Sequence, residues 1–167
     1  MLSYIIISIL PAAWLIAAIN DLGELKIPNW IPVTLVLMFP VMAATFGYSF
    51  EMLSSSLLLA IGALVVGFAI YATGQFGAGD VKLLAATALW VGPAAFPMFL
   101  FKVILASGIF AFAIIMFRST PMLPVYAHAP WLMELHGSRR AMPYGVGIAL
   151  GGFWSLHEAM AFTAVFG

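Results

Sequence analysis

Six apolar runs follow one another along this chain of 167 residues, and most are long enough to cross a lipid bilayer. A helix needs about 20 mainly apolar residues to cross the hydrocarbon, and backbone groups in lipid must bond within their own segment, so each run is predicted to be helical. The fourth run either ends at Gly92-Pro93 or continues, kinked, past Pro97. The predicted spans cover about residues 3–20, 31–47, 55–73, 81–91, 98–117 and 144–162.

The composition excludes a water-soluble fold. Hydrophobic residues make up 65% of the chain and charged residues 7%, whereas soluble domains contain about 45–50% and about 25%. So few polar residues cannot cover a soluble core. We therefore expect an all-α integral membrane protein, with one membrane-embedded domain over residues 1–167. The first run lacks the positively charged start of a secretory signal and is expected to be a retained helix.

The net charge and the absence of cysteine exclude further classes of protein and of functional site. The formal net charge is zero, which argues against a nucleic-acid partner, because nucleic-acid-binding surfaces carry a basic stripe. The chain has no Cys, so disulfides, thiolate nucleophiles and cysteine-based zinc sites are excluded. His128 and His136 lie eight residues apart in a proline-rich segment, which is too loose a spacing to predict a metal site. No metal or cofactor is therefore expected.

The positions of Lys and Arg predict how the chain crosses the membrane. Cytoplasmic joints between spans carry an excess of these residues. With six spans, the first, third and fifth joints share one side, and they hold Lys26, Lys82, Arg118, Arg139 and Arg140. That side is predicted to be cytoplasmic, with both termini outside. Lys102, near the outer start of the fifth span, is the exception and is expected to snorkel to the outer headgroups.

The segment 118–143, between the fifth and sixth spans, is more polar than the spans. It contains four prolines and two histidines. An interfacial, partly amphipathic segment on the headgroups and a plain connecting loop both remain possible here. In the span that follows, Gly147 and Gly151 have the spacing that permits close helix packing.

Two aspartates lie at the predicted cytoplasmic ends of spans. Asp21 ends the first span and Asp80 begins the fourth, so the topology places both at the same depth on one face. Two close carboxylates can share a proton, and one then activates a water while the other protonates the carbonyl oxygen or the leaving amine. Taken singly, each has an ordinary explanation: Asp80 is a good N-cap before Val81, and Asp21 is an interfacial charge that pairs with Lys26.

Asp80 ends a glycine-rich quartet, Gly77-Ala78-Gly79-Asp80, at the membrane surface. Glycines permit unusual backbone angles and close approach of another chain, so Gly77 and Gly79 are expected to shape a loop that receives substrate. The quartet lacks the Gly-Lys-Ser/Thr ending of a phosphate loop. Lys82 could stabilise the aspartate pair or anchor the helix at the inner headgroups, and we favour the anchor.

Three stretches together resemble the type IV prepilin peptidases, and the similarity extends over essentially the whole chain. The short length is most similar to the peptidases of Tad/Flp pilus systems. The stretches are Asp21 with Lys26-Ile27-Pro28-Asn29, Gly77-Ala78-Gly79-Asp80-Val81-Lys82-Leu83-Leu84, and Pro143-Tyr144-Gly145-Val146-Gly147-Ile148-Ala149.

The resemblance implies a specific activity. These peptidases cut a short, positively charged leader from pilin precursors at the cytoplasmic face of the bacterial inner membrane, and their catalytic aspartates match Asp21 and Asp80. The implied partners are a prepilin with its hydrophobic helix, the lipid bilayer and the pilus assembly machinery. Larger members carry a cytoplasmic domain with Cys-x-x-Cys motifs that supports N-methylation. This chain has no Cys, so no methyltransferase domain is expected.

Other functions remain open. A small proton- or ion-coupled transporter could use the same aspartates, although transport sites usually lie near the midplane on broken helices within internal repeats. A non-catalytic subunit of a pilus or secretion assembly would need them only for capping and pairing. Presenilin-like intramembrane proteases share a Gly-x-Gly-Asp motif, but their other aspartate follows a Tyr, whereas Asn20 precedes Asp21 here.

Overall fold

All regular structure is helical in the part of the chain that the computed structural model describes, which is residues 2–74, 76–121, 130–137 and 142–166. Within these residues, three helices are long and apolar enough to cross a membrane, namely Ser3–Glu24, Phe50–Tyr71 and Ala78–Ser119. The expected all-α membrane fold is confirmed. The predicted orientation stays a prediction, and His128, Arg139 and Arg140 lie outside the described residues.

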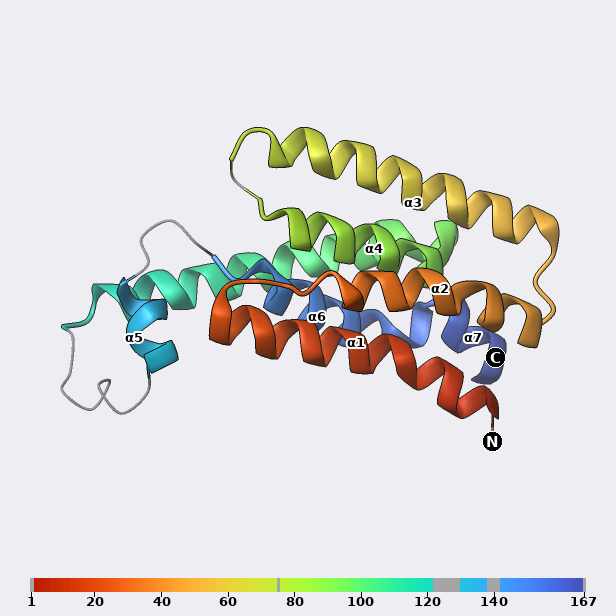
Figure 1. Cartoon of the computed structure of the whole chain (residues 1–167), viewed down its shortest axis with the longest axis horizontal. Helices are drawn as coiled ribbons and strands as arrows, with labels where there is room; N and C mark the ends of the chain where they lie inside the picture. The colour runs from red at the N-terminus through yellow and green to blue at the C-terminus, as the bar shows by residue number, and fades with distance from the viewer. Residues whose placement is uncertain (1, 75, 122–129, 138–141, 167) are drawn as a thin grey trace.

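The helices form an elongated bundle (Figure 1). Helix α1 covers Leu2–Glu24, α2 covers Trp30–Thr45 and α3 covers Phe50–Tyr71. Helix α3 begins earlier than its apolar run, because the Ser49 hydroxyl accepts a hydrogen bond from the Met52 N–H and caps the helix there. The later elements are α4 (Ala78–Ser119), α5 (Pro130–Gly137), α6 (Tyr144–Ser155), the short 3₁₀-helix η2 (Leu156–Glu158) and α7 (Met160–Phe166).

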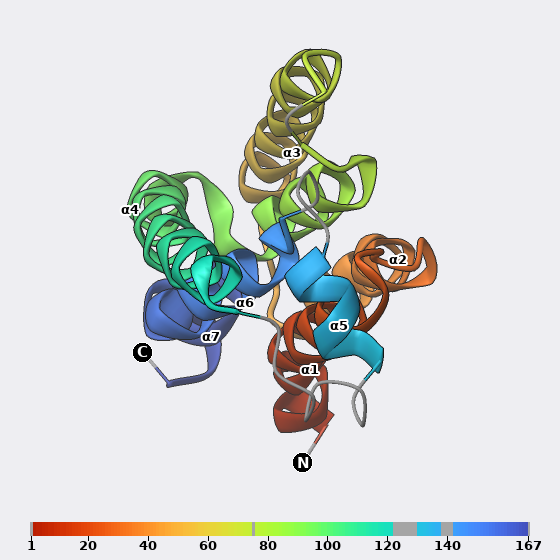
Figure 2. The ribbon, with the colours of Figure 1, turned by 90° about the vertical axis from the view of Figure 1, so that its left-hand side faces the viewer.

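Helix α4 contains a reversal of chain direction. A straight helix of its 42 residues would be roughly 63 Å long, yet Asp80 in its first turn and Ser107 in its second half both lie beside the first turn of α6. Gly92 breaks the helix with φ 78° and ψ 162°, a conformation that only glycine adopts readily. The first half (78–91) and the second half (93–119) therefore run in opposite directions (Figures 1 and 2). Pro93 begins the second half, where its missing N–H costs nothing.

Buried tryptophans and glycines hold α4 against its neighbours. The Trp14 indole of α1 donates to the Thr87 hydroxyl at 3.0 Å, and the Trp90 indole donates to the Leu35 carbonyl of α2 at 2.9 Å. In α6, Gly147 and Gly151 lie directly against the second half of α4, where an added Cβ would clash. The close packing expected of these glycines therefore occurs within the chain.

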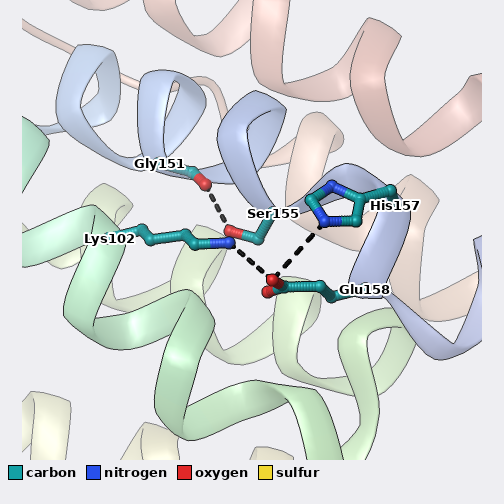
Figure 3. A network of polar contacts seen from close by, with 5 residues as sticks. All are labelled: Lys102, Gly151, Ser155, His157 and Glu158. Carbon is teal, nitrogen blue, oxygen red and sulfur yellow. Dashed lines mark hydrogen bonds and ion pairs between the residues drawn. The ribbon is translucent and has the colours of Figure 1, made fainter.

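The expectation for Lys102 is wrong. Its side chain does not extend outward, because Lys102 is only 8% exposed and its Nζ lies 2.7 Å from Oε1 of Glu158 in η2 (Figure 3). His157 adds a contact of 3.5 Å to the same oxygen. The Glu158 carboxylate compensates the charge of the Lys102 ammonium group inside the bundle. This ion pair joins α4 to η2.

We expect removal of one partner of this pair to destabilise the bundle. Lys102→Met leaves Glu158 with an unpaired charge, and breaking a buried pair in this way costs about 3–5 kcal/mol. The partial exposure of Glu158 places the expected loss near the lower limit. Thermal unfolding in detergent should show a lower melting temperature for Lys102→Met and partial recovery for Lys102→Met/Glu158→Gln. Lys26→Met, at an exposed site, is the control. Equal melting temperatures for all variants would contradict a stabilising role for the pair.

The segment 118–143 contains helix α5, which lies beside α1 and the end of α4 (Figure 2). The Arg118 Nε donates to the Leu135 carbonyl at 2.9 Å, and the Phe117 and His136 rings meet edge to face at 5.1 Å. Leu135 is buried while Trp131 is exposed, as in an amphipathic helix. The plain-loop alternative is therefore wrong for residues 130–137.

Candidate active site

The structure brings Asp21 and Asp80 into one cleft. Asp21 lies in the last turn of α1 and Asp80 in the first turn of α4, and they are 4% and 6% exposed. The cleft has a volume of about 440 Å³. Its walls are the α1–α2 connection and the glycine quartet, with the lining residues Asp21, Glu24, Leu25, Lys26, Ile27, Pro28, Asn29, Gly77, Ala78, Gly79 and Asp80.

A backbone N–H from a third helix holds Asp21. Gly145, the second residue of α6, donates from its N–H to Oδ2 of Asp21 at 2.7 Å in a buried position. The first N–H groups of a helix have no partner within the helix, and the helix dipole favours negative charge beside them. Asp21 is thus oriented by α6. Among the described residues Asp21 forms no ion pair with Lys26, so the interpretation as a surface ion pair is wrong.

Asp80 is the third residue of α4 and not its N-cap. The helix begins at Ala78 after the N-cap Gly77, and Oδ2 of Asp80 accepts a hydrogen bond from the Gly77 N–H at 3.2 Å. Its other oxygen, Oδ1, is buried and makes no hydrogen bond within the described part of the chain. Burying such an atom without a partner is costly, so capping alone does not explain this carboxylate.

The two carboxylates lie close enough to interact. The charge of Asp21 acts on Asp80, and the Gly145 N–H lies near Asp80 as well. Three helix ends therefore meet at this point: the end of α1 and the beginnings of α4 and α6. Such an arrangement can hold a proton between two carboxylates and position a small polar molecule beside them.

The glycines of the quartet act through space and not through unusual backbone angles. Gly77 has φ −79° and ψ 143°, which any residue can adopt. A Cβ on Gly79 would lie 3.0 Å from Cβ of Ile27 and 3.3 Å from its carbonyl oxygen. Gly79 therefore allows the α1–α2 connection to pack directly on the start of α4. In that connection Leu25 has a positive φ of 51°, which is uncommon outside glycine.

Lys82 points away from the aspartates. Its Nζ donates to Oδ1 of Asn29 at 2.9 Å, and the side chain lines a neighbouring hollow and not the cleft of the aspartates. None of its contacts within the described residues reaches Asp21 or Asp80, so the stabilising role for the pair receives no support. Lys82 instead joins α4 to the start of α2.

Sequence reasoning missed the part played by Gly145. A Cβ there would lie 2.8 Å from Cδ1 of Ile27 and 2.9 Å from Oδ2 of Asp21. Its neighbour Tyr144 stacks on Phe76, with ring centroids 4.5 Å apart and an interplanar angle of 16°. The sequence does show a glycine directly after Pro143-Tyr144, where the last apolar run begins. It does not indicate that this glycine faces Asp21.

Comparison with known proteins gives one match. The sequence profile described as the type IV leader peptidase family matches residues 8–112, a range that includes Asp21, Asp80 and the glycine quartet. No curated protein and no solved structure matches the chain.

Proposed function

Because the chain belongs to the type IV leader peptidase family, we propose that it is an aspartic endopeptidase that cuts the leader from a type IV prepilin, with Asp21 and Asp80 as the catalytic pair. One observation carries the proposal. Two aspartates 59 positions apart in the sequence are buried in one cleft, and Oδ1 of Asp80 lacks a hydrogen-bond partner among the described residues. By its resemblance to the peptidases of Tad/Flp pilus systems, the substrate that we propose is a Flp-type prepilin.

The geometry supports a mechanism without a covalent intermediate. One carboxylate removes a proton from a water, and that water attacks the carbonyl carbon of the scissile peptide bond. The other carboxylate, protonated at the start, donates its proton to the carbonyl oxygen. Collapse of the tetrahedral intermediate then expels the amine, which takes up a proton from the pair, while one hydroxyl group of the intermediate returns a proton to the pair. The Gly145 N–H keeps Asp21 oriented throughout. The two carboxylates titrate as a unit, so neither role is assigned to a single residue.

The same proposal places the cleavage at the cytoplasmic face of the inner membrane. The end of the bundle that carries the aspartates also carries Lys26, Lys82 and Arg118, while the start of α1 and the end of α7 lie at the opposite end (Figure 1). Positively charged residues favour the cytoplasmic side. A basic leader emerging into the cytoplasm would meet the carboxylates of the cleft there.

The test is cleavage of a prepilin in a defined bilayer. We expect the wild-type protein, reconstituted in liposomes with a precursor that carries a basic leader and an apolar helix, to release the leader. Mass spectrometry of the product should show one new N-terminus at the junction of leader and helix. A precursor that stays intact with correctly inserted wild-type protein would overturn the proposed function, and proton flux across the same liposomes would then test the transporter alternative.

A further inference from the structure

A second hollow lies beside the cleft, between α2, α3 and the first half of α4. It has a volume of about 410 Å³. Only two of its lining side chains, Asn29 and Lys82, carry polar groups; the remaining ones are apolar. They are Pro32, Val33, Val36 and Leu37 from α2, Leu57, Ala60, Ile61 and Leu64 from α3, and Ala85, Ala86 and Leu89 from α4. We refer to this hollow as the apolar groove.

The apolar groove has a floor of small side chains. Ala85 and Ala86 of α4 and Ala60 of α3 lie at its base and are all buried. Helix α3 lies at the edge of the bundle against the first half of α4, and α2 lies on the other side of the groove (Figure 2). Small residues at such positions let a further helix approach closely within a membrane, where van der Waals packing stabilises helix association.

The apolar groove adjoins the cleft of the two aspartates at Asn29. Asn29 lines both hollows, and its hydrogen bond to Lys82 lies at their junction. On one side of Asn29 the cleft carries three carboxylates, Asp21, Glu24 and Asp80. Its single ammonium group is that of Lys26, because Lys82 lines the groove and not the cleft. On the other side the lining is apolar. The lining therefore changes from mainly acidic to apolar across a single residue, Asn29.

We propose that the apolar groove binds the hydrophobic helix of the protein substrate, next to the bond that is cut. The inference rests on the proposed function: a substrate chain that leaves the cleft past Asn29 enters the groove directly. The groove extends along α4 from Lys82 to Leu89, seven residues and about 10 Å, which matches two turns of a docked helix. A basic leader in the acidic cleft and an apolar helix in the groove then place the junction of the two at the aspartates. A lipid acyl chain could also occupy an apolar groove, but its binding would not require the groove to adjoin an acidic cleft.

Filling the groove should impair cleavage without disturbing the fold. Val36→Trp places an indole in the groove from a side chain that is 48% exposed. Val41→Trp is the matched control, since Val41 lies on the same helix, is 47% exposed and lies outside the groove lining. We expect cleavage of the helical precursor to fall at least about tenfold for Val36→Trp, because lost burial of one or two side chains has that effect. Val41→Trp should cleave at the wild-type rate.

Cross-linking separates this proposal from the proposed function. The chain has no Cys, so Val36→Cys in an Asp80→Asn background supplies one thiol in the groove, and Val41→Cys supplies the control. With a single Cys in the precursor helix, oxidation should form a disulfide at position 36 and none at position 41. Absence of the link at 36, or equal cleavage by the two Trp variants, would overturn the groove as a docking site even where wild-type protein cleaves. If the disulfide forms at position 36 but the wild-type protein cleaves no precursor, the groove binds the helix and the proposed peptidase activity is wrong.

Discussion

Asp21→Asn and Asp80→Asn should each reduce prepilin cleavage at least about 100-fold, because a general acid or base contributes about 10²–10⁴-fold to a rate. Asparagine has nearly the same shape as aspartate, and its side-chain oxygen can still accept the hydrogen bond from Gly145 or from Gly77. It cannot take up a proton from water. The substitutions therefore remove the chemistry and keep the packing. Cleavage should be measured at equal amounts of inserted protein in the same membranes.

The matched control changes a carboxylate that lies elsewhere. Glu51→Gln makes the same chemical change in the first turn of α3, at an exposed position outside the cleft, and should cleave like the wild type. If either Asp variant cleaves like Glu51→Gln, the paired mechanism is wrong. If the double variant Asp21→Asn/Asp80→Asn also supports pilus assembly in cells, the protein acts as a non-catalytic subunit.

Gly145→Ala is expected to reduce cleavage about as strongly as the loss of an aspartate. The new methyl group would lie within 3 Å of Ile27 and of Asp21, a separation at which one of them must shift. Movement of the Asp21 carboxylate breaks its hydrogen bond to the Gly145 N–H, and a displacement of about 1 Å in a catalytic group can cost about 100-fold in rate. The measurement is the initial rate of precursor cleavage in liposomes.

Gly108→Ala controls for the general effect of alanine in a membrane helix. A Cβ on Gly108 has no atom within 4 Å, so this variant should cleave normally and melt at the wild-type temperature. Gly145→Ala should also insert and remain folded in detergent, since its backbone is helical and only the local contacts change. Wild-type cleavage by Gly145→Ala would show that Asp21 does not depend on α6 for its position.

The helical membrane fold and the pairing of the aspartates follow from the sequence because they depend on local patterns. Apolar runs predict helices wherever lipid is the solvent, and alternating joints place Asp21 and Asp80 at the same end. The reversal at Gly92 was one of two possibilities, because Gly-Pro permits both a turn and a kink. The start of α3 was missed because the capping Ser49 lies before a stretch that contains Glu51 and three serines.

The contacts that complete the site could not be predicted, because they join segments far apart in the sequence. Gly145 reaches Asp21 across 124 positions, and Lys102 reaches Glu158 across 56. Such contacts depend on the rotation and axial position of each helix in the bundle. Neither quantity is encoded in an apolar run, whose residues are similar on all sides. For the same reason the sequence indicated that Gly147 and Gly151 pack closely, without indicating that α4 is their partner.

The length of α2 has a consequence for the surrounding lipid. Its 16 residues extend about 24 Å, which is shorter than the roughly 30 Å of a typical hydrocarbon core. Local thinning of the bilayer is one way in which a helix shorter than the hydrocarbon core is accommodated. The annulus of lipid beside α2 is therefore expected to dip toward Asn29, so that headgroups and bulk water descend to the depth of the carboxylates. Water would then reach the two carboxylates from the membrane surface, without a channel through the bundle.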